Sequence, residues 1–104
     1  RALPGVAVSL SSEVSPIAGE YERASTVCAN AYVQPLMARY LDRLQARLAT
    51  RGVTAPLLVM MSEGGLTSVE TACRFPVRLI ESGPAGGALL AASIGRRLGI
   101  DRAI

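Results

Sequence analysis

The segment from position 25 to 51 constrains the fold most, because its apolar residues recur three or four positions apart, the spacing of one helix face. These residues are Val33, Met37, Tyr40, Leu41, Leu44 and Leu48. Ser25 or Thr26 can cap the start of the helix, and Pro35 can bend it. Gly52 follows, where a C-terminal glycine belongs. The sequence therefore predicts one long helix that buries a single stripe.

Arginine supplies all the basic side chains, and four of them are spaced four apart on this predicted helix. They are Arg39, Arg43, Arg47 and Arg51. The net charge is only +3, aromatic residues make up 4% of the chain, and no known nucleic-acid-binding motif is present. The stripe is typical of a solvated helix face, so we expect no nucleic-acid partner.

Short apolar segments alternate with predicted helices along the chain. Residues 56–61 form a continuous apolar run, typical of a strand covered on both faces, and residues 77–81 predict another buried strand. Residues 5–11 alternate small apolar and polar side chains like a strand, and a loop is expected over 12–19. The order predicts an α/β fold, a layered mixed or parallel sheet with flanking helices, forming a single partial domain over 1–104.

Two further helices complete this prediction. Thr67 and Glu70 have the spacing of a capping box at the start of a short helix that ends before Pro76. The last helix should begin with Pro84 at its first position, run to residue 98 and stop at Gly99. It is rich in Gly and Ala, which leaves a flat surface for the close approach of another helix or of a ligand.

Half of the 104 residues are hydrophobic, which suffices for a core, and no apolar run approaches the roughly 20 residues that cross a bilayer. We therefore expect a soluble, cytoplasmic protein without a membrane partner. Cys28 and Cys73 lie far apart and the chain has no His, so buried free thiols are expected and no metal site.

Two glycine turns, each after a predicted strand, are the candidate site. The residues are Ser62, Glu63, Gly64, Gly65, Glu81, Ser82, Gly83, Gly86 and Gly87. At the carboxyl ends of parallel strands the turns would flank one cleft, where backbone N–H groups could hold phosphate or polarise a carbonyl. The alternative is a pair of structural turns with solvated carboxylates. Neither serine has a His or Lys partner, so a nucleophilic serine is not expected.

Four polar residues near the start of the long helix are further candidates. Glu20, Glu22 and Arg23 could form an ion-pair cluster at the helix entry, and Asn30 is a polar residue on an otherwise apolar helix turn. We favour structural roles for all four.

Four motifs, at residues 20–26, 30–33, 61–66 and 80–87, resemble the hydantoinase A and 5-oxoprolinase family in the expected order. The resemblance implies a lobe with the actin-like, ribonuclease H-like ATPase fold, in which the helix from Pro84 connects two lobes. It implies ATP-dependent opening of a cyclic amide such as hydantoin or 5-oxoproline, with ATP and magnesium as cofactors of the parent enzyme. Partners implied are the cyclic-amide substrate, the remaining lobes and a hydantoinase B-type subunit.

The sequence departs from the family in two ways. Both Asp-x-Gly-Gly-Thr phosphate loops are absent, and Glu63 stands where the family usually has Asn. We therefore expect an internal fragment that supplies cleft wall, binds no nucleotide alone and is inactive alone. The alternatives are a fragment of an acetone- or acetophenone-type carboxylase subunit, and a non-catalytic α/β interaction module. A piece of a larger sheet should also expose apolar surface and self-associate or bind a partner.

Overall fold

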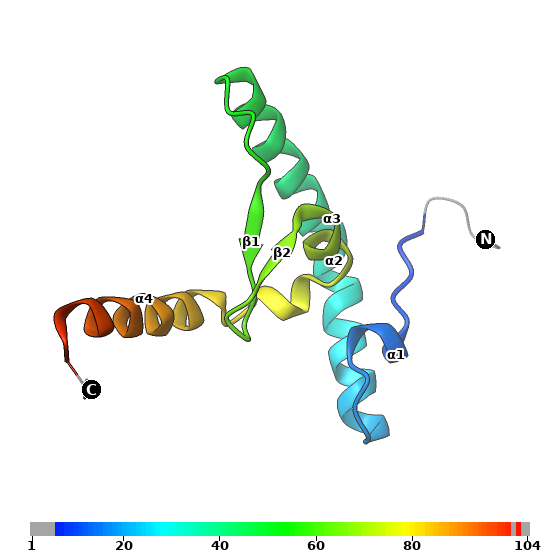
Figure 1. The fold of residues 1–104 in the computed structure, drawn as a ribbon. Helices are drawn as coiled ribbons and strands as arrows, with labels where there is room; N and C mark the ends of the chain where they lie inside the picture. Colours follow the sequence, from blue (N-terminus) through cyan, green and yellow to red (C-terminus); the bar gives the residue numbers. More distant parts are fainter. Residues whose placement is uncertain (1–5, 101, 103–104) are drawn as a thin grey trace.

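The computed structural model describes residues 6–100 and 102 of the chain. In chain order the elements are α1 (Ser11–Val14), α2 (Glu20–Thr50), β1 (Leu58–Met60), β2 (Leu66–Ser68), α3 (Val69–Arg74), the 3₁₀-helix η1 (Pro76–Leu79) and α4 (Ser82–Leu98). Figure 1 shows α2 as a long rod with α1 and α3 beside it, and α4 projecting away from the rest. The described chain is therefore a mostly helical α/β arrangement with a two-stranded sheet.

The long helix is confirmed, although it begins five residues earlier than predicted, after Gly19. Ser25 and Thr26 lie within it, where their hydroxyls donate to the Glu22 carbonyl and cap nothing. The helix continues through Pro35 and ends before Gly52, whose φ of +78° suits the predicted glycine stop.

The small core lies between α2 and α3. Leu41, Val69 and Ala72 are buried there, and Met37 and Leu44 pack against them, as the predicted stripe requires. Tyr40 was predicted in the same stripe, but it is 59% exposed. Arg39, Arg43 and Arg47 of α2 are exposed, as expected for a solvated face.

The predicted layered sheet is wrong for the described residues, which contain one antiparallel hairpin. β1 confirms a strand within 56–61, but β1 is short, and Leu58 is 51% exposed where burial on both faces was expected. Val59 pairs with Thr67 of β2. Gly64, with φ of +85°, lets the chain reverse between the two strands.

The strand predicted at 77–81 is also wrong, because the backbone groups of this segment bond elsewhere. Pro76 is the first residue of η1, and its ring fixes φ near the helical value. The Val77 N–H donates to the Asn30 side chain, and the Arg78 N–H donates to the Phe75 carbonyl. With these donors satisfied, the segment forms a turn of 3₁₀-helix without a neighbouring strand.

The N-terminal strand predicted at 5–11 is not formed in its described part, because residues 6–10 have no regular structure and Ser11 begins α1; residue 5 lies outside the described residues. Ser9 instead donates through its hydroxyl to Gln34 of α2 and accepts from Asn30. The loop predicted at 12–19 contains part of α1, whose Val14 is buried.

The two C-terminal helices form near the predicted positions but begin differently. Ser68, one residue after the predicted Thr67, caps α3 by accepting the Thr71 N–H at 3.3 Å. α4 begins at Ser82, so Pro84 is its third residue and not its first. Its predicted stop is confirmed, because Gly99 ends the helix with φ of +68°.

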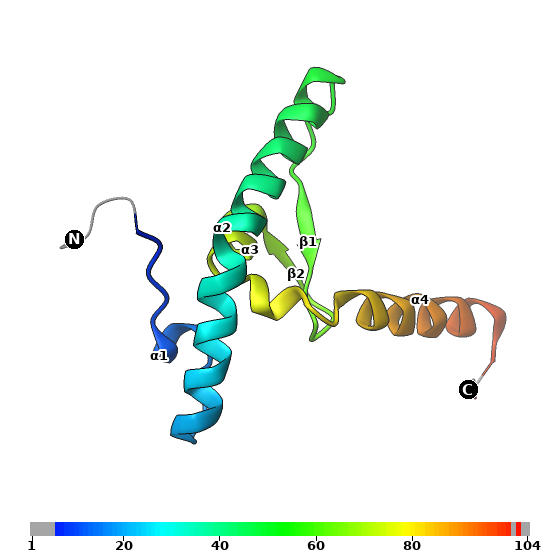
Figure 2. The same cartoon turned by 180° about the vertical axis from the view of Figure 1, so that it is seen from behind.

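The molecule is flat and extended. Its principal extents are 57 × 44 × 15 Å and its radius of gyration is 17.0 Å, against about 13 Å for a compact chain of 100 residues. Figure 2 shows from behind that α4 meets the rest only near its N-terminal end. Among the helices of the described residues, none combines the length and apolarity that crossing a membrane requires.

Candidate functional site

The two glycine turns meet through a side chain of the first and the backbone of the second. The Ser62 hydroxyl accepts the Glu81 N–H at 3.1 Å. The Ser62 N–H donates to the Arg78 carbonyl at 2.7 Å. The first bond attaches the tip of the β1–β2 hairpin to the residue before α4, and the second attaches it to η1. The parallel strands expected to align the turns are absent from the described residues.

Close packing holds the hairpin tip against α4. A side-chain carbon at Gly64 would lie 3.2 Å from Leu89 of α4, and one at Gly86 would lie 3.9 Å from Met60 of β1. Within the tip, the Met61 N–H donates to the Gly65 carbonyl and the Gly64 N–H donates to the Met61 carbonyl. Gly64 is therefore required both for the turn and for this approach.

The N-terminal end of α4 is open. A side-chain carbon at Gly83 or Gly87 would meet nothing within 4 Å. The first hydrogen bond of the helix runs from the Ala85 N–H to the Glu81 carbonyl, and Ser82 and Gly83 have no recorded backbone acceptor among the described residues. Their N–H groups, together with the helix dipole, favour a negative charge or a polarised carbonyl oxygen there.

The side chains at this junction supply hydrogen bonds but no acid–base pair. Ser62 and Ser82 are half-buried, and the Glu63 and Glu81 carboxylates are exposed. The chain has no His and no Lys that could activate a serine. Within the described range, no three acidic, cysteine or histidine side chains gather as metal ligands. These groups can orient a polar group at the junction.

A second polar cluster, around Asn30, has a structural role, as predicted for this residue. Asn30 is fully buried and donates to the Ser9 hydroxyl and to the Arg74 carbonyl, each at 3.0 Å. Its carbonyl oxygen accepts the Val77 N–H at 3.3 Å. One amide therefore joins α2 to the segment before α1 and to the α3–η1 connection.

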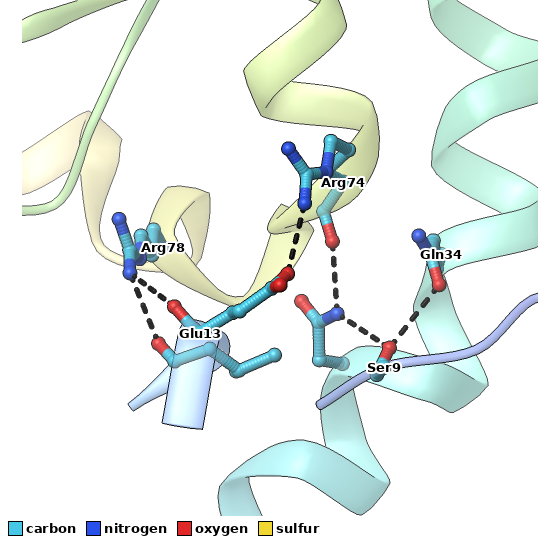
Figure 3. Close-up of polar contacts among 7 residues, drawn as sticks. Ser9, Glu13, Gln34, Arg74 and Arg78 are labelled. Atoms are coloured by element: carbon cyan, nitrogen blue, oxygen red, sulfur yellow. Dashed lines mark hydrogen bonds and ion pairs between the residues drawn. The ribbon is translucent and has the colours of Figure 1, made fainter. Parts of the chain in front are cut away.

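Beside this cluster, Arg74 and Arg78 hold α1 through contacts that no sequence pattern predicted (Figure 3). Arg74 pairs with the Glu13 carboxylate at 2.8 Å, and Arg78 donates to the carbonyls of Glu13 and Val14. Both guanidinium groups lie over the Phe75 ring, 5.0 and 4.7 Å from its centroid. The partners are more than 60 positions apart, so only the tertiary fold brings them together.

A groove of about 520 Å³ between α2 and α3 lies beside the partly buried thiol of Cys73. Burial raises the pKa of the Cys73 thiol, and the Asp42 carboxylate raises it further. Cys28, predicted to be buried, is exposed instead. Both cysteines are free thiols, and the raised pKa makes Cys73 a poor nucleophile.

The geometry defines a mostly helical α/β chain in which a glycine hairpin is attached to the open N-terminus of a helix rich in small residues. Residues 23–104 match the family described as hydantoinase/oxoprolinase. The chain belongs to this family, which confirms the resemblance identified from the four motifs.

Three relatives show how this chain is placed. It is 38% identical to an uncharacterized protein of Methanocaldococcus jannaschii over 95% of the chain and 15% of that protein. It is 37% identical to the caprolactamase subunit alpha of Pseudomonas jessenii over 99% of the chain and 15% of the subunit. It is 40% identical to the 5-oxoprolinase of Saccharomyces cerevisiae over 79% of the chain and 6% of that enzyme. The chain thus spans less than a sixth of these relatives, and no solved structure gives a significant match.

Proposed function

We propose that this chain is part of an ATP-dependent cyclic-amide hydrolase that opens rings such as hydantoin or 5-oxoproline. Membership of the hydantoinase/oxoprolinase family supports the reaction class. The names of two relatives, caprolactamase and 5-oxoprolinase, refer to compounds that contain a ring amide. In this proposal the hairpin tip and the start of α4 form cleft wall, and α4 connects two lobes of an actin-like fold.

The proposed reaction uses ATP to activate a stable amide. In this scheme the ring-amide oxygen attacks the γ-phosphorus of ATP and ADP leaves, which makes the ring carbon more electrophilic. Water adds to that carbon, and the ring C–N bond breaks as the nitrogen takes up a proton. A second water hydrolyses the acyl phosphate that remains, so the products are the ring-opened acid, ADP and phosphate. In the proposal, ATP and magnesium are held by parts of the parent protein outside this chain, which lacks the family's phosphate loops.

One observation supports the site more than any other, namely the hydrogen bond from the Glu81 N–H to the Ser62 hydroxyl. Because the hydroxyl oxygen accepts this bond, its own proton is available for a second partner. The free N–H groups of Ser82 and Gly83 lie in the first turn of α4. Together these donors can contact the phosphate or the substrate carbonyl, where charge develops during the reaction.

The test uses the longer polypeptide that contains this chain, purified together with any companion subunit. It is incubated with hydantoin, 5-oxoproline or caprolactam, with and without ATP and magnesium, while ADP and the open-chain product are quantified. Ring opening should require ATP. Ser62→Ala should lower kcat/KM by at least about tenfold, because it removes a positioned hydroxyl donor.

Ser12→Ala is the matched control, since it removes an exposed hydroxyl from α1 and should leave the rate unchanged. Absence of ATP-dependent ring opening with all three amides would overturn the proposal. ATP-dependent fixation of bicarbonate onto a ketone would instead identify a carboxylase subunit. The 104-residue chain alone should not hydrolyse ATP. Substantial hydrolysis would contradict the proposal that ATP is held by parts of the parent protein outside this chain.

A further inference from the structure

An exposed stripe runs along α2 on the side that the rest of the chain leaves uncovered. Its positions are three or four residues apart, so at about 100° per residue they fall on one side of the helix. All of them are exposed. We call this set the α2 stripe: Glu22, Ser25, Ala29, Tyr32, Leu36, Tyr40, Arg43 and Arg47.

The internal contacts of α2 use the opposite side of the helix. Arg23 donates to Ser11 in α1, Asn30 holds the α3–η1 connection, and Leu41 is buried against α3. The centre of the α2 stripe is apolar and open to solvent, with Tyr32 88% and Leu36 63% exposed. Large apolar side chains in such a row form a surface suited to another helix.

The α2 stripe is complementary to itself when read in the reverse direction. In an antiparallel pair, Glu22 lies opposite Arg47 of a second copy and Ser25 lies opposite its Arg43. Toward the centre, Ala29 lies opposite Tyr40 of the second copy, and Tyr32 lies opposite its Leu36. Acid therefore meets base at both ends, and small residues meet large ones in between. A parallel pair would place like charges and equal tyrosines against each other.

The basic end of the α2 stripe carries a groove and has no ion-pair partner among the residues that the structure describes. Tyr40, Arg43 and Arg47 line this groove, with a volume of about 260 Å³. The ion pair found in the described part of the chain is Glu13–Arg74, which leaves Arg43 and Arg47 free. Side chains the size of Glu22 and Ser25 of a second copy match both the space and the charge.

We propose that two copies of this chain associate through their α2 stripes in an antiparallel, two-fold symmetric contact. The proposal is independent of the proposed enzymatic function. The two-fold axis passes between Tyr32 and Leu36, and each half of the contact repeats the other. Because the apolar centre is short and the ion pairs are exposed, the dimer is of moderate affinity.

The test measures the dissociation constant of the longer polypeptide that contains this chain by sedimentation equilibrium, with Glu22→Arg and Arg47→Glu variants. Each reversal places like charges together at two symmetric positions, so each variant should dimerise about tenfold more weakly. A mixture of the two variants should form a mixed dimer with about the wild-type constant, since opposite charges then meet at both ends. Within one helix the two positions are about 37 Å apart and cannot compensate each other.

Arg96→Glu is the matched control, because it reverses an exposed arginine on α4 and should leave the constant unchanged. Far-ultraviolet circular dichroism verifies that every variant keeps its helix content. A monomeric wild-type chain at millimolar concentration would overturn the proposal. So would failure of the mixture to recover, or a dimer that α2 reversals leave intact and Leu98→Glu on the exposed face of α4 abolishes.

Discussion

Replacing Asn30 by Ala should destabilise this chain more than its small change in volume suggests. The Asn30 side chain makes three hydrogen bonds and is fully buried. The substitution leaves the Val77 N–H and the Arg74 carbonyl without their partner in a site closed to water. At about 1 kcal/mol for each lost bond, the free energy of unfolding should fall by about 3 kcal/mol. That is a large part of the 5–15 kcal/mol typical of a folded domain.

Urea unfolding followed by circular dichroism gives this free energy, and a thermal scan should show Tm lowered by roughly 12 °C or more. The Val77 amide provides a local readout, because its hydrogen exchange should accelerate more than that of amides in the middle of α2. Asn30→Asp keeps an acceptor for the Val77 N–H but loses both donated bonds, so it separates the contribution of the accepted bond from that of the two donated bonds.

Gln45→Ala is the control, since it shortens an exposed polar side chain on the same helix and should change stability by less than about 0.5 kcal/mol. An Asn30→Ala chain as stable as this control would refute the account of Asn30 as the tie between α2 and the α3–η1 connection. Global destabilisation with an unchanged Val77 exchange pattern would equally contradict it.

Two further predictions concern the hairpin and the thiols. Gly64→Ala should lower the free energy of unfolding by about 1–2 kcal/mol, because the φ of Gly64 is +85° and α4 lies close by. Gly87→Ala should instead stabilise α4 by up to about 1 kcal/mol. If urea unfolding ranked the two variants in the opposite order, the turn geometry would be contradicted. At pH 8, Cys73 should react with iodoacetamide more slowly than the exposed Cys28, since burial and Asp42 raise the pKa of Cys73. Asp42→Asn should lower this pKa and accelerate the reaction of Cys73. Equal Cys73 rates in the unmutated protein and in the variant would exclude the electrostatic effect of Asp42.

Helices were predictable from the sequence wherever the determinants are local. The apolar spacing across residues 33–48 identified α2, and Gly99 identified the end of α4. The start of α2 was misplaced because Ser25 and Thr26 are good caps in isolation, yet Gly19 already allows the chain to enter the helix. Local sequence patterns therefore predicted that these helices exist better than they predicted the residues at which the helices begin.

The errors at 5–11 and 77–81 have one physical cause. An apolar or alternating segment predicts a strand only if its N–H and C=O groups find a neighbouring strand. Here Asn30 takes the Val77 N–H across 47 positions, and Ser9 binds α2 through its hydroxyl. Nothing local distinguishes these partners in advance. For the candidate site the motifs identified the two turns, but only the structure shows that Ser62 joins them.

The contacts of α4 support its proposed role as a connector. The helix buries none of its own residues, and four of its seventeen positions are glycine, each costing roughly 1 kcal/mol against Ala. Leu90 and Leu98 are more than 60% exposed on its surface. Such a helix gains little stability from the described chain, which contacts its N-terminal half through Ser62 and Leu89. Its small residues are explained if another backbone approaches closely. The junction with the hairpin then fixes one end of α4, while that partner fixes the rest.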